Sequence, residues 1–303
     1  MMLWDDASLS ADASLGNQCT WLWRGWRIRY TYLRPATITA TQNPPILLIH
    51  GFGASLQQWR DNLVALSHHH PVYAIDLLGF GGSQKAATSF GTALWIEQVH
   101  DFWQIWIGRP MILLGHSLGA LVALTATVTY PAMVEKLVML TLPAARQELL
   151  SGWVETVSSK MEQWFSSPLL IRLIFQIFRQ PGVIRKTLGG VYQISERVDD
   201  ALVEQYVRPT RDRGAARTLC YLVRSRTTPQ FAPATQQLIQ RLQIPTLLLW
   251  GDADRVIPLT WGRQLPPLND HITLIEIPAA GHCLYDEYPT RINNHVLDWL
   301  REN

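Results

Sequence analysis

The sequence predicts an α/β protein with a mostly parallel, doubly wound sheet. Several short, predominantly apolar runs have the composition of strands buried on both faces: 46–49, 72–75, 111–114, 137–140 and 246–250. Segments with helical spacing follow several of these runs, and glycine-rich or polar loops stand directly after them. In such sheets ligands bind at the carboxyl ends of the strands, so these loops mark where chemistry is expected.

The first part of the chain is predicted to add a polar leader and an edge hairpin. Residues 1–18 carry several aspartates and have the composition of a loose leader. In residues 21–34, aromatic or aliphatic side chains alternate with polar ones around Gly25. This pattern is typical of two antiparallel strands joined by a tight turn at the edge of a sheet.

Helices are predicted where apolar side chains recur with a period of about 3.6 residues. The segments with this spacing are 55–66, 92–107, 118–129 and 291–301. A further strand is predicted at 272–277. Strands that alternate with helices fit one large domain, and a chain of 303 residues can bury its core.

The alternation stops after the strand at 137–140 and resumes with the strand at 246–250. We therefore predict a core made of residues 19–142 and 243–303, interrupted by an insertion at residues 143–242. The insertion is conspicuously apolar.

One segment of the insertion has an unusually wide apolar face. A helix at 169–180 places Arg172, Gln176, Arg179 and Gln180 on one narrow arc and leaves apolar side chains around the rest. Basic residues outnumber acidic ones nearby, which is typical of a helix resting in a membrane interface. Burial of the same face on the core explains the pattern equally well, so two interpretations stand.

Composition excludes several classes of protein. A net charge of +2 argues against a dedicated nucleic-acid binder, and three scattered cysteines without C-x-x-C suggest neither a disulfide framework nor a zinc site. The acidic N-terminus lacks the pattern of a secretory signal, and we find no apolar run of about 18 residues that could span a bilayer. We expect a cytoplasmic protein.

The stretch that organises the chain is the motif G-H-S-L-G at 115–119, which follows the apolar run at 111–114. A strand that turns abruptly into a helix at Ser117 forces that residue into a strained conformation and brings its neighbours against adjacent elements. Gly115 and Gly119 supply the missing Cβ atoms that this close approach needs. The pattern predicts an exposed nucleophilic hydroxyl at the start of the helix.

A serine hydroxyl needs a neighbouring base, and the base works best when a carboxylate fixes its tautomer. The sequence offers both in loops directly after strands. An acidic loop at 251–255 contains Asp252 and Asp254, and a later loop contains His282. We predict that His282 is the base and that one of the two aspartates orients it.

The oxyanion formed when a carbonyl is attacked needs preorganised donors. Two backbone N–H groups are predicted to serve: Leu118, directly after the nucleophile, and Phe52, in the H-G-F-G loop after the strand at 46–49. Gly51 and Gly53 on either side of Phe52 let that loop approach closely.

The order serine, acid, histidine resembles the arrangement of the α/β-hydrolase superfamily. The resemblance favours Asp254 over Asp252, because the superfamily pattern G-x-x-D-x-x-x-P fits Gly251, Asp254 and Pro258. It implies an eight-stranded α/β-hydrolase sheet, with the insertion at 143–242 as a helical cap after the sixth strand.

The same resemblance narrows the reaction. Relatives with aspartate at the elbow open epoxides or displace halide, whereas serine, as in Ser117, points to acyl transfer and normally to ester hydrolysis. Asp76 in D-x-x-G-x-G-x-S then corresponds to a structural loop, and Asp286 and Glu287 after the histidine are interpreted as structural too.

A more specific resemblance covers most of the chain. The motifs L-L-I-H-G-F-G-A-S, Y-A-I-D-L-L-G-F-G-G-S, R-P-M-I-L-L-G-H-S-L-G-A and P-A-A-G-H-C-L-Y-D-E are similar to the pheophytinase and chlorophyll dephytylase group of oxygenic phototrophs. This resemblance implies hydrolysis of a phytyl ester in a wide apolar pocket, and attachment to the periphery of an internal photosynthetic membrane as an alternative location. Candidate pocket residues are His50, Gly51, Gly53, His116, Trp153, Trp164 and Phe165, of which the last three could equally be interface anchors or packing residues.

These observations predict a serine esterase of bulky apolar esters, with Ser117, His282 and Asp254 as its triad. No cofactor or metal is implied, and the partner is a small apolar ester. The enzymatic alternatives are a carbon–carbon bond hydrolase and a generic lipase. The alternative that is not an enzyme is a ligand-binding receptor on the same fold.

Overall fold

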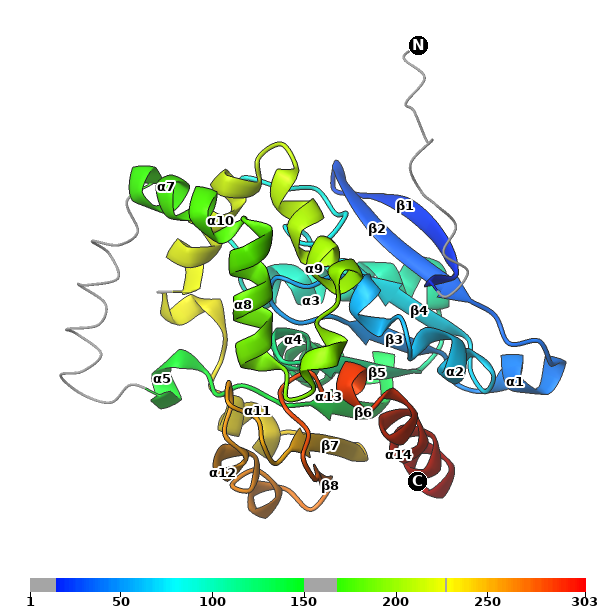
Figure 1. The fold of residues 1–303 in the computed structure, drawn as a ribbon. Helices are drawn as coiled ribbons and strands as arrows, with labels where there is room; N and C mark the ends of the chain where they lie inside the picture. Colours follow the sequence, from blue (N-terminus) through cyan, green and yellow to red (C-terminus); the bar gives the residue numbers. More distant parts are fainter. Residues whose placement is uncertain (1–14, 150–167, 227) are drawn as a thin grey trace, which may run out of the picture.

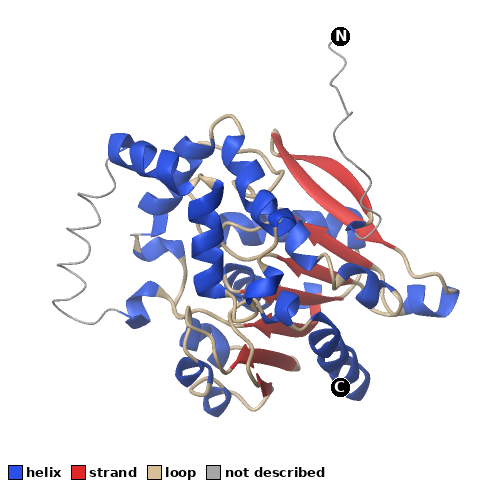
Figure 2. Ribbon diagram, viewed as in Figure 1, coloured by secondary structure: helices blue, strands red, loops and turns tan. Residues whose placement is uncertain are grey.

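The computed structural model describes residues 15–149, 168–226 and 228–303 (Figure 1). Within these residues, an eight-stranded sheet runs through the molecule with helices on both faces (Figure 2). The strands are β1 (Asn17–Trp23), β2 (Trp26–Leu33), β3 (Ile46–Ile49), β4 (Val72–Ile75), β5 (Met111–His116), β6 (Val134–Leu140), β7 (Thr246–Gly251) and β8 (Ile272–Ile277). Their spatial order is β1-β2-β4-β3-β5-β6-β7-β8.

The strands are parallel from β4 to β8 in the spatial order, and β2 runs antiparallel to both of its neighbours, β1 and β4. The predicted fold class is therefore confirmed. The β1–β2 hairpin turns at Arg24 (φ 50°) and Gly25 (φ 83°), the two positive φ angles that a tight two-residue hairpin turn requires. β1 begins at Asn17, and Leu15 is already buried, so ordered structure starts inside the predicted leader.

The helices of the core are α1 (Ile38–Gln42), η2 (Leu56–Trp59), α2 (Leu63–Ser67), α3 (Thr92–Phe102), η3 (Trp103–Ile107), α4 (Leu118–Thr129), η4 (Pro131–Met133), α12 (Leu259–Gly262), η8 (Pro266–Leu268), α13 (Leu284–Glu287) and α14 (Pro289–Glu302). Those of the predicted insertion are α5 (Arg146–Leu149), α7 (Pro168–Phe178), α8 (Pro181–Val191), η5 (Ser195–Arg197), α9 (Asp200–Val207), η6 (Arg208–Arg211), α10 (Ala215–Arg226), η7 (Pro229–Phe231) and α11 (Thr235–Gln240).

Two predicted helices are interrupted. The segment at 55–66 forms the 3₁₀ turn η2 and then the short helix α2, separated at Asn62, whose side chain donates to the Tyr285 carbonyl (3.3 Å) and to Asn293 Oδ1 (2.8 Å). The segment at 92–107 leaves α3 for one π-helical turn, closed by Gly108 at φ 67°. Tertiary contacts and a glycine cap thus override the helical periodicity.

The sheet separates two apolar layers. In β3, Ile46 and Leu48 point into the layer that contains α2, α13 and α14, while Leu47 and Ile49 point into the layer that contains α3 and α4. All four side chains are fully buried. This double burial explains why the strand has no polar position and why it could be recognised from sequence as an uninterrupted apolar run.

The helices α7 to α10 form a group of their own, with α7 at its outer edge (Figure 1). On α7, Ile171 and Phe175 are buried, whereas Leu173, Ile177 and Phe178 are 64%, 56% and 57% exposed. The wide apolar face predicted for this helix is therefore divided into a packed side and an open side. In the described ranges, we find no helix with the length and apolar character needed to cross a bilayer.

Candidate active site

Ser117 occupies the sharp turn between β5 and α4. Its backbone adopts φ 53° and ψ −116°, a conformation that costs a non-glycine residue about 1–3 kcal/mol. Two hydrogen bonds hold the turn: the Ser117 N–H donates to the Leu140 carbonyl at 3.0 Å, and the Leu121 N–H donates to the Ser117 carbonyl at 3.1 Å. The strained conformation predicted from the G-x-S-x-G motif is thus present.

Both glycines of the motif are required because neighbouring backbone atoms leave no room for a Cβ. A Cβ on Gly119 would lie 2.2 Å from the Ile49 carbonyl oxygen at the end of β3. A Cβ on Gly115 would lie 2.3 Å from the carbonyl oxygen of Gly119 itself. These contacts are with backbone atoms that cannot rotate away, so the turn can pack against the sheet only without side chains at these positions.

Asp254 and His282 form a direct hydrogen bond. The His282 Nδ1–H donates to Asp254 Oδ2 at 2.8 Å, and both side chains are almost completely buried. The other carboxylate oxygen, Oδ1, accepts the N–H groups of Val256 (2.7 Å) and Ile257 (2.9 Å). Three donors therefore fix the carboxylate, and the bond at Nδ1 leaves Nε2 of His282 as the basic nitrogen.

The neighbouring aspartate has a different environment. Asp252 is exposed, and its Oδ1 accepts the Ala279 N–H at 2.8 Å. It stabilises the loop between β8 and the histidine and, within the described ranges, makes no hydrogen bond to the His282 ring. Geometry thus agrees with the preference for Asp254 that the family resemblance suggested.

His282 and the elbow are connected through His116, the residue before Ser117. The His116 Nε2–H donates to the His282 carbonyl at 3.0 Å, and the two rings lie 4.8 Å apart between centroids. Burial lowers the pKa of His116 well below its usual value, so this ring stays neutral. His116 is buried and holds the backbone of His282 in place; its predicted contact with substrate stays a prediction.

Ser117 is partly exposed and, among the described residues, its side chain makes no hydrogen bond to His282. Hydrogen bonds between nucleophile and base are often long in ligand-free sites and tighten when substrate binds. The structure therefore brings the elbow and the Asp254–His282 pair together at one edge of the sheet, with the bond from serine to base left open.

The two predicted oxyanion donors lie on loops that touch each other. A Cβ on Gly51 would come within 2.8 Å of His116 Nδ1, so the loop after β3 packs directly against the elbow. Within the part of the chain that the structure describes, neither the Phe52 N–H nor the Leu118 N–H donates a hydrogen bond. Unused N–H groups at a helix start and an adjacent glycine loop are suited to bind developing negative charge.

His50 supports this loop from beneath. Its Nδ1–H donates to the Gly51 carbonyl at 2.7 Å, and its Nε2 accepts the Leu77 N–H at 3.0 Å. Burial lowers the pKa of His50 and keeps it neutral, which this arrangement of one donor and one acceptor requires. With no exposed surface, His50 shapes the loop from the interior.

The loop conformation also agrees with the predicted role of its glycines. Gly53 has φ 73°, a value that strongly favours glycine. Phe52 is 41% exposed, and the guanidinium of Arg226 from α10 lies 5.3 Å from its ring centroid. This contact joins the insertion to the loop after β3, and nothing in the local sequence pattern signalled it.

Two acidic residues after His282 anchor its loop to the insertion. The Asp286 carboxylate accepts hydrogen bonds from three side chains: Arg60 Nε (3.0 Å), a guanidinium nitrogen of Arg197 (2.5 Å) and the Tyr192 hydroxyl (2.9 Å). Arg60 comes from the core, whereas Tyr192 and Arg197 come from the segment between α8 and α9. The structural role predicted for Asp286 is thus a specific one, because it links core and cap directly beside the base.

Glu287 completes this link. Its Oε2 accepts the N–H groups of Gly281 (3.3 Å), Gln193 (3.1 Å) and Ile194 (3.3 Å). Burial raises the pKa of Glu287, although these three donors oppose the shift. The loop that carries His282 is therefore tied to the insertion by backbone hydrogen bonds as well as by ion pairs.

Three predicted pocket residues, Trp153, Trp164 and Phe165, lie outside the described residues. Their contact with substrate stays a prediction.

Comparison with known proteins agrees with the fold. The family model for the alpha/beta hydrolase fold matches residues 44–289. The uncharacterised hydrolase YugF of Bacillus subtilis (strain 168) is 24% identical over 267 residues, which cover 86% of this chain and 92% of the relative. Epoxide hydrolase 3 of Xenopus tropicalis is 27% identical over 276 residues, covering 86% of this chain and 72% of the relative.

Further similar proteins have names that describe different activities. The 2-hydroxy-6-oxo-6-(2'-aminophenyl)hexa-2,4-dienoic acid hydrolase of Metapseudomonas resinovorans is 24% identical over 270 residues, covering 87% of this chain and 86% of the relative. Among solved structures, a membrane phospholipase A has a TM-score of 0.75 at 24% identity, covering 96% of this chain and 87% of that chain. A serine hydrolase involved in carbazole degradation (CarC) has a TM-score of 0.74 at 21% identity, covering 94% and 99%. With its family model matched over most of its length, the chain belongs to the α/β-hydrolase fold family.

Proposed function

We propose that this protein is a serine hydrolase that cleaves carboxylic esters of bulky apolar alcohols or acids. The observation that carries the proposal is the buried Asp254–His282 hydrogen bond of 2.8 Å beside the strained Ser117 elbow. The identity of the residue at the elbow also supports the proposal. Serine at this position suits acyl transfer, whereas the epoxide-opening relatives of this superfamily carry aspartate there.

In the proposed reaction, the Ser117 Oγ attacks the ester carbonyl carbon while His282 Nε2 takes the hydroxyl proton. The resulting oxyanion accepts hydrogen bonds from the Phe52 and Leu118 N–H groups, each of which contributes about 2.7–4 kcal/mol to lowering the barrier. The C–O bond then breaks, and the alcohol leaves with the proton from His282. Water, deprotonated by the same nitrogen, releases the acid and restores the serine.

Asp254 has a supporting part in this scheme. It holds the Nδ1 proton of His282, so that Nε2 is free to accept a proton, and it stabilises the imidazolium that forms. Two backbone N–H groups on Oδ1 fix the orientation of this carboxylate toward the ring of His282.

For the substrate class we propose a long isoprenoid ester such as the phytyl ester of a chlorophyll-type pigment. The support is the sequence resemblance to the pheophytinase and chlorophyll dephytylase group and the apolar character of the insertion. Cleavage of a carbon–carbon bond in a vinylogous ketone is the second candidate. It is favoured by the similarity to the Metapseudomonas hydrolase, and CarC is likewise described as a serine hydrolase.

One set of assays separates these candidates. We expect p-nitrophenyl esters to be hydrolysed with kcat/KM that rises with acyl chain length, chlorophyll a or pheophytin a to release phytol, and Ser117→Ala to abolish both activities. A preference for acetyl and butyryl esters with untouched pigments would refute the pigment proposal. Turnover of a vinylogous 1,5-diketone without any ester hydrolysis would favour the carbon–carbon candidate. A folded protein that binds apolar esters without turnover would be a receptor.

A further inference from the structure

A short segment of the insertion, residues 191–194 between α8 and η5, reaches the loops that carry Asp254 and His282. These are the acid loop, residues 251–255, and the base loop, residues 278–283. The side-chain amide of Gln193 donates from Nε2 to the Ala253 carbonyl at 2.9 Å. Ala253 directly precedes Asp254, so this hydrogen bond ties the insertion to the acid loop.

The same segment is bound to the base loop through Glu287. The backbone N–H groups of Gln193 (3.1 Å) and Ile194 (3.3 Å) donate to Glu287 Oε2. This oxygen also accepts the N–H of Gly281 (3.3 Å), the residue before His282. Gln193 is therefore linked to both loops, to one through its side chain and to the other through its backbone.

The segment also packs closely against the base loop. A Cβ on Gly281 would lie 3.0 Å from the Val191 carbonyl oxygen and 3.1 Å from Cγ of Gln193, both closer than ordinary van der Waals contact. Close packing therefore prevents the segment from moving nearer to the base loop, while its hydrogen bonds oppose a movement away.

The acid loop and the base loop contact each other as well. The Ala253 N–H donates to the Ala280 carbonyl at 3.0 Å, and a Cβ on Gly251 would lie 2.3 Å from the same carbonyl oxygen. The two loops and the segment 191–194 thus form a closed ring of contacts. Because Asp254 and His282 each follow a residue of this ring, the ring sets the separation at which their side chains meet.

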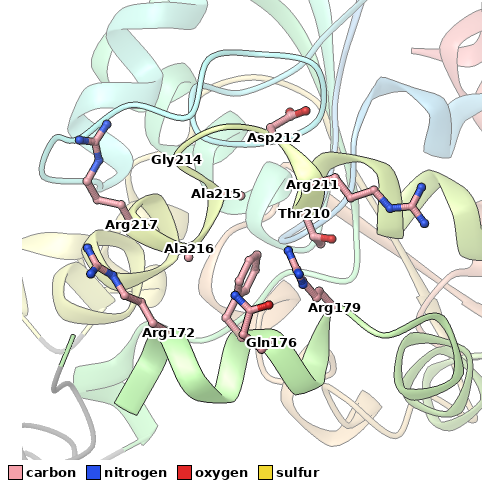
Figure 3. Close-up of a pocket in the computed structure, with 11 residues that line it drawn as sticks. Arg172, Gln176, Arg179, Thr210, Arg211, Asp212, Gly214, Ala215, Ala216 and Arg217 are labelled. Carbon is pink, nitrogen blue, oxygen red and sulfur yellow. The ribbon is translucent and has the colours of Figure 1, made fainter. Parts of the chain in front are cut away.

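Another side of the insertion is fixed elsewhere on the core. A cavity of about 250 Å³ lies there, and the described residues that line it belong to α7, η6, α10 and the turn between η6 and α10 (Figure 3). On this side Asp212 pairs with Lys85 Nζ at 3.0 Å, and the Thr218 hydroxyl donates to the Ala86 carbonyl at 2.8 Å. These contacts hold the insertion to the chain after β4, whereas Gln193 contacts the acid and base loops.

We propose that Gln193 is a positioning residue for the Asp254–His282 pair. Its amide holds the acid loop and its N–H holds the base loop through Glu287, so that the hydrogen bond of 2.8 Å between the pair keeps its geometry. The inference rests on the proposed function, in which this pair activates Ser117. It adds a residue of the insertion that acts on the pair rather than on the substrate.

The test is Gln193→Met, which keeps the length of the side chain and removes its N–H donor. We expect kcat on a p-nitrophenyl ester to fall by about tenfold to a hundredfold, because a displacement of about 1 Å in a catalytic group costs about a hundredfold. KM should stay unchanged, as for an interaction that is needed only in the transition state. An unchanged kcat in the folded variant, or a rise in KM alone, would overturn the proposal.

Gln180→Met is the matched control. Gln180 belongs to the same insertion, and its amide donates to the Gln176 carbonyl at 3.0 Å, so the variant loses the same kind of hydrogen bond away from both loops. Its kcat should equal that of the wild type. Urea unfolding measures the stability of both variants, and a destabilised Gln193→Met protein with the wild-type kcat would show a merely structural contact and refute the role.

A double variant tests whether Gln193 acts through the pair. In the Asp254→Asn background, Gln193→Met should lower the residual kcat little further, because the pair that it positions is already disabled. A further loss as large as in the wild-type background would show an independent action and overturn the proposal.

The Nδ1 proton of His282 gives a readout that needs no turnover. A proton held between an imidazole and a buried carboxylate gives a proton NMR signal far downfield, and its loss in Asp254→Asn assigns it. We expect this signal to broaden or disappear in Gln193→Met, because a looser hydrogen bond lets the proton exchange with water, and to persist in Gln180→Met. An unchanged signal in Gln193→Met would overturn the proposal.

The two readouts separate this inference from the proposed function. A wild-type protein that hydrolyses no ester would refute the esterase, and the NMR signal would then decide the role of Gln193 by itself. Ester hydrolysis by the wild type together with an unchanged kcat and an unchanged signal in Gln193→Met would refute the role of Gln193 and leave the esterase standing.

Discussion

The variant Asp254→Asn should keep the structure of the proposed site but change which nitrogen of His282 carries the proton. Oδ1 of Asp254 accepts the Val256 and Ile257 N–H groups, while Oδ2 receives the His282 Nδ1–H at 2.8 Å. In an asparagine, the oxygen stays toward the two backbone donors, because the opposite orientation would point NH₂ at them. The amide then donates to the ring of His282, so Nδ1 becomes an acceptor and the proton moves to Nε2.

An imidazole with its proton on Nε2 cannot accept the proton of Ser117. The corresponding Asp-to-Asn change in a serine-protease triad lowers kcat about 10⁴-fold, which corresponds to about 5 kcal/mol of barrier. Stability should change little, since two of three hydrogen bonds remain and a single one contributes about 0.5–1.5 kcal/mol. The variant should therefore be folded and nearly inactive.

The assay is kcat on a p-nitrophenyl ester, measured together with urea unfolding. Asp252→Asn is the matched control, because this exposed aspartate accepts a hydrogen bond from the Ala279 N–H and, in the described part of the chain, makes none to His282. We expect the kcat of this variant to stay within about twofold of the wild type, because substitutions of exposed residues usually have small effects. A folded Asp254→Asn protein that keeps more than a tenth of the wild-type kcat would refute the reasoning.

Three further results are expected. Gly119→Ala should lower the free energy of unfolding by about 3 kcal/mol or more, because its Cβ would meet the Ile49 carbonyl oxygen, and urea unfolding measures the loss. Gly189→Ala, in open space on α8, should instead raise it by about 0.5–1 kcal/mol; a loss there would contradict the helix. Burial opposes ionisation of Asp76, but the Arg29 guanidinium and backbone donors hold the pKa of this carboxyl below its usual value. The ionised carboxylate therefore stabilises the fold above about pH 4, the unfolded pKa, and this stability is lost as the pH falls through the native pKa. Acid titration of unfolding should show this dependence in the wild type and not in Asp76→Asn.

Elements could be predicted from sequence where the local residue pattern directly reflects the burial or the backbone angles of the element. The strand at 46–49 is buried on both faces and has an uninterrupted apolar run, and the hairpin turn has glycine where a positive φ is needed. The elbow was recognisable because Gly115 and Gly119 are dictated by backbone contacts within a few residues or one neighbouring strand.

Features that depend on distant contacts could not be predicted. The break near Asn62 follows from hydrogen bonds to residues more than two hundred positions away. The connection of Asp286 to Tyr192 and Arg197 joins the base loop to the insertion, and no periodic pattern encodes it. The division of α7 into a packed and an open side likewise depends on which helices lie against it.

The most direct test of the proposed enzyme is covalent labelling of Ser117 by a fluorophosphonate that carries an alkyl chain. Such a reagent reacts with a serine whose hydroxyl is activated by a neighbouring base, and peptide mass spectrometry locates the adduct. We predict one adduct on Ser117 with parallel loss of ester hydrolysis, slow labelling in Asp254→Asn, and no labelling in Ser117→Ala. A folded wild-type protein that stays unlabelled, or that hydrolyses esters equally well as Ser117→Ala, would contradict the account.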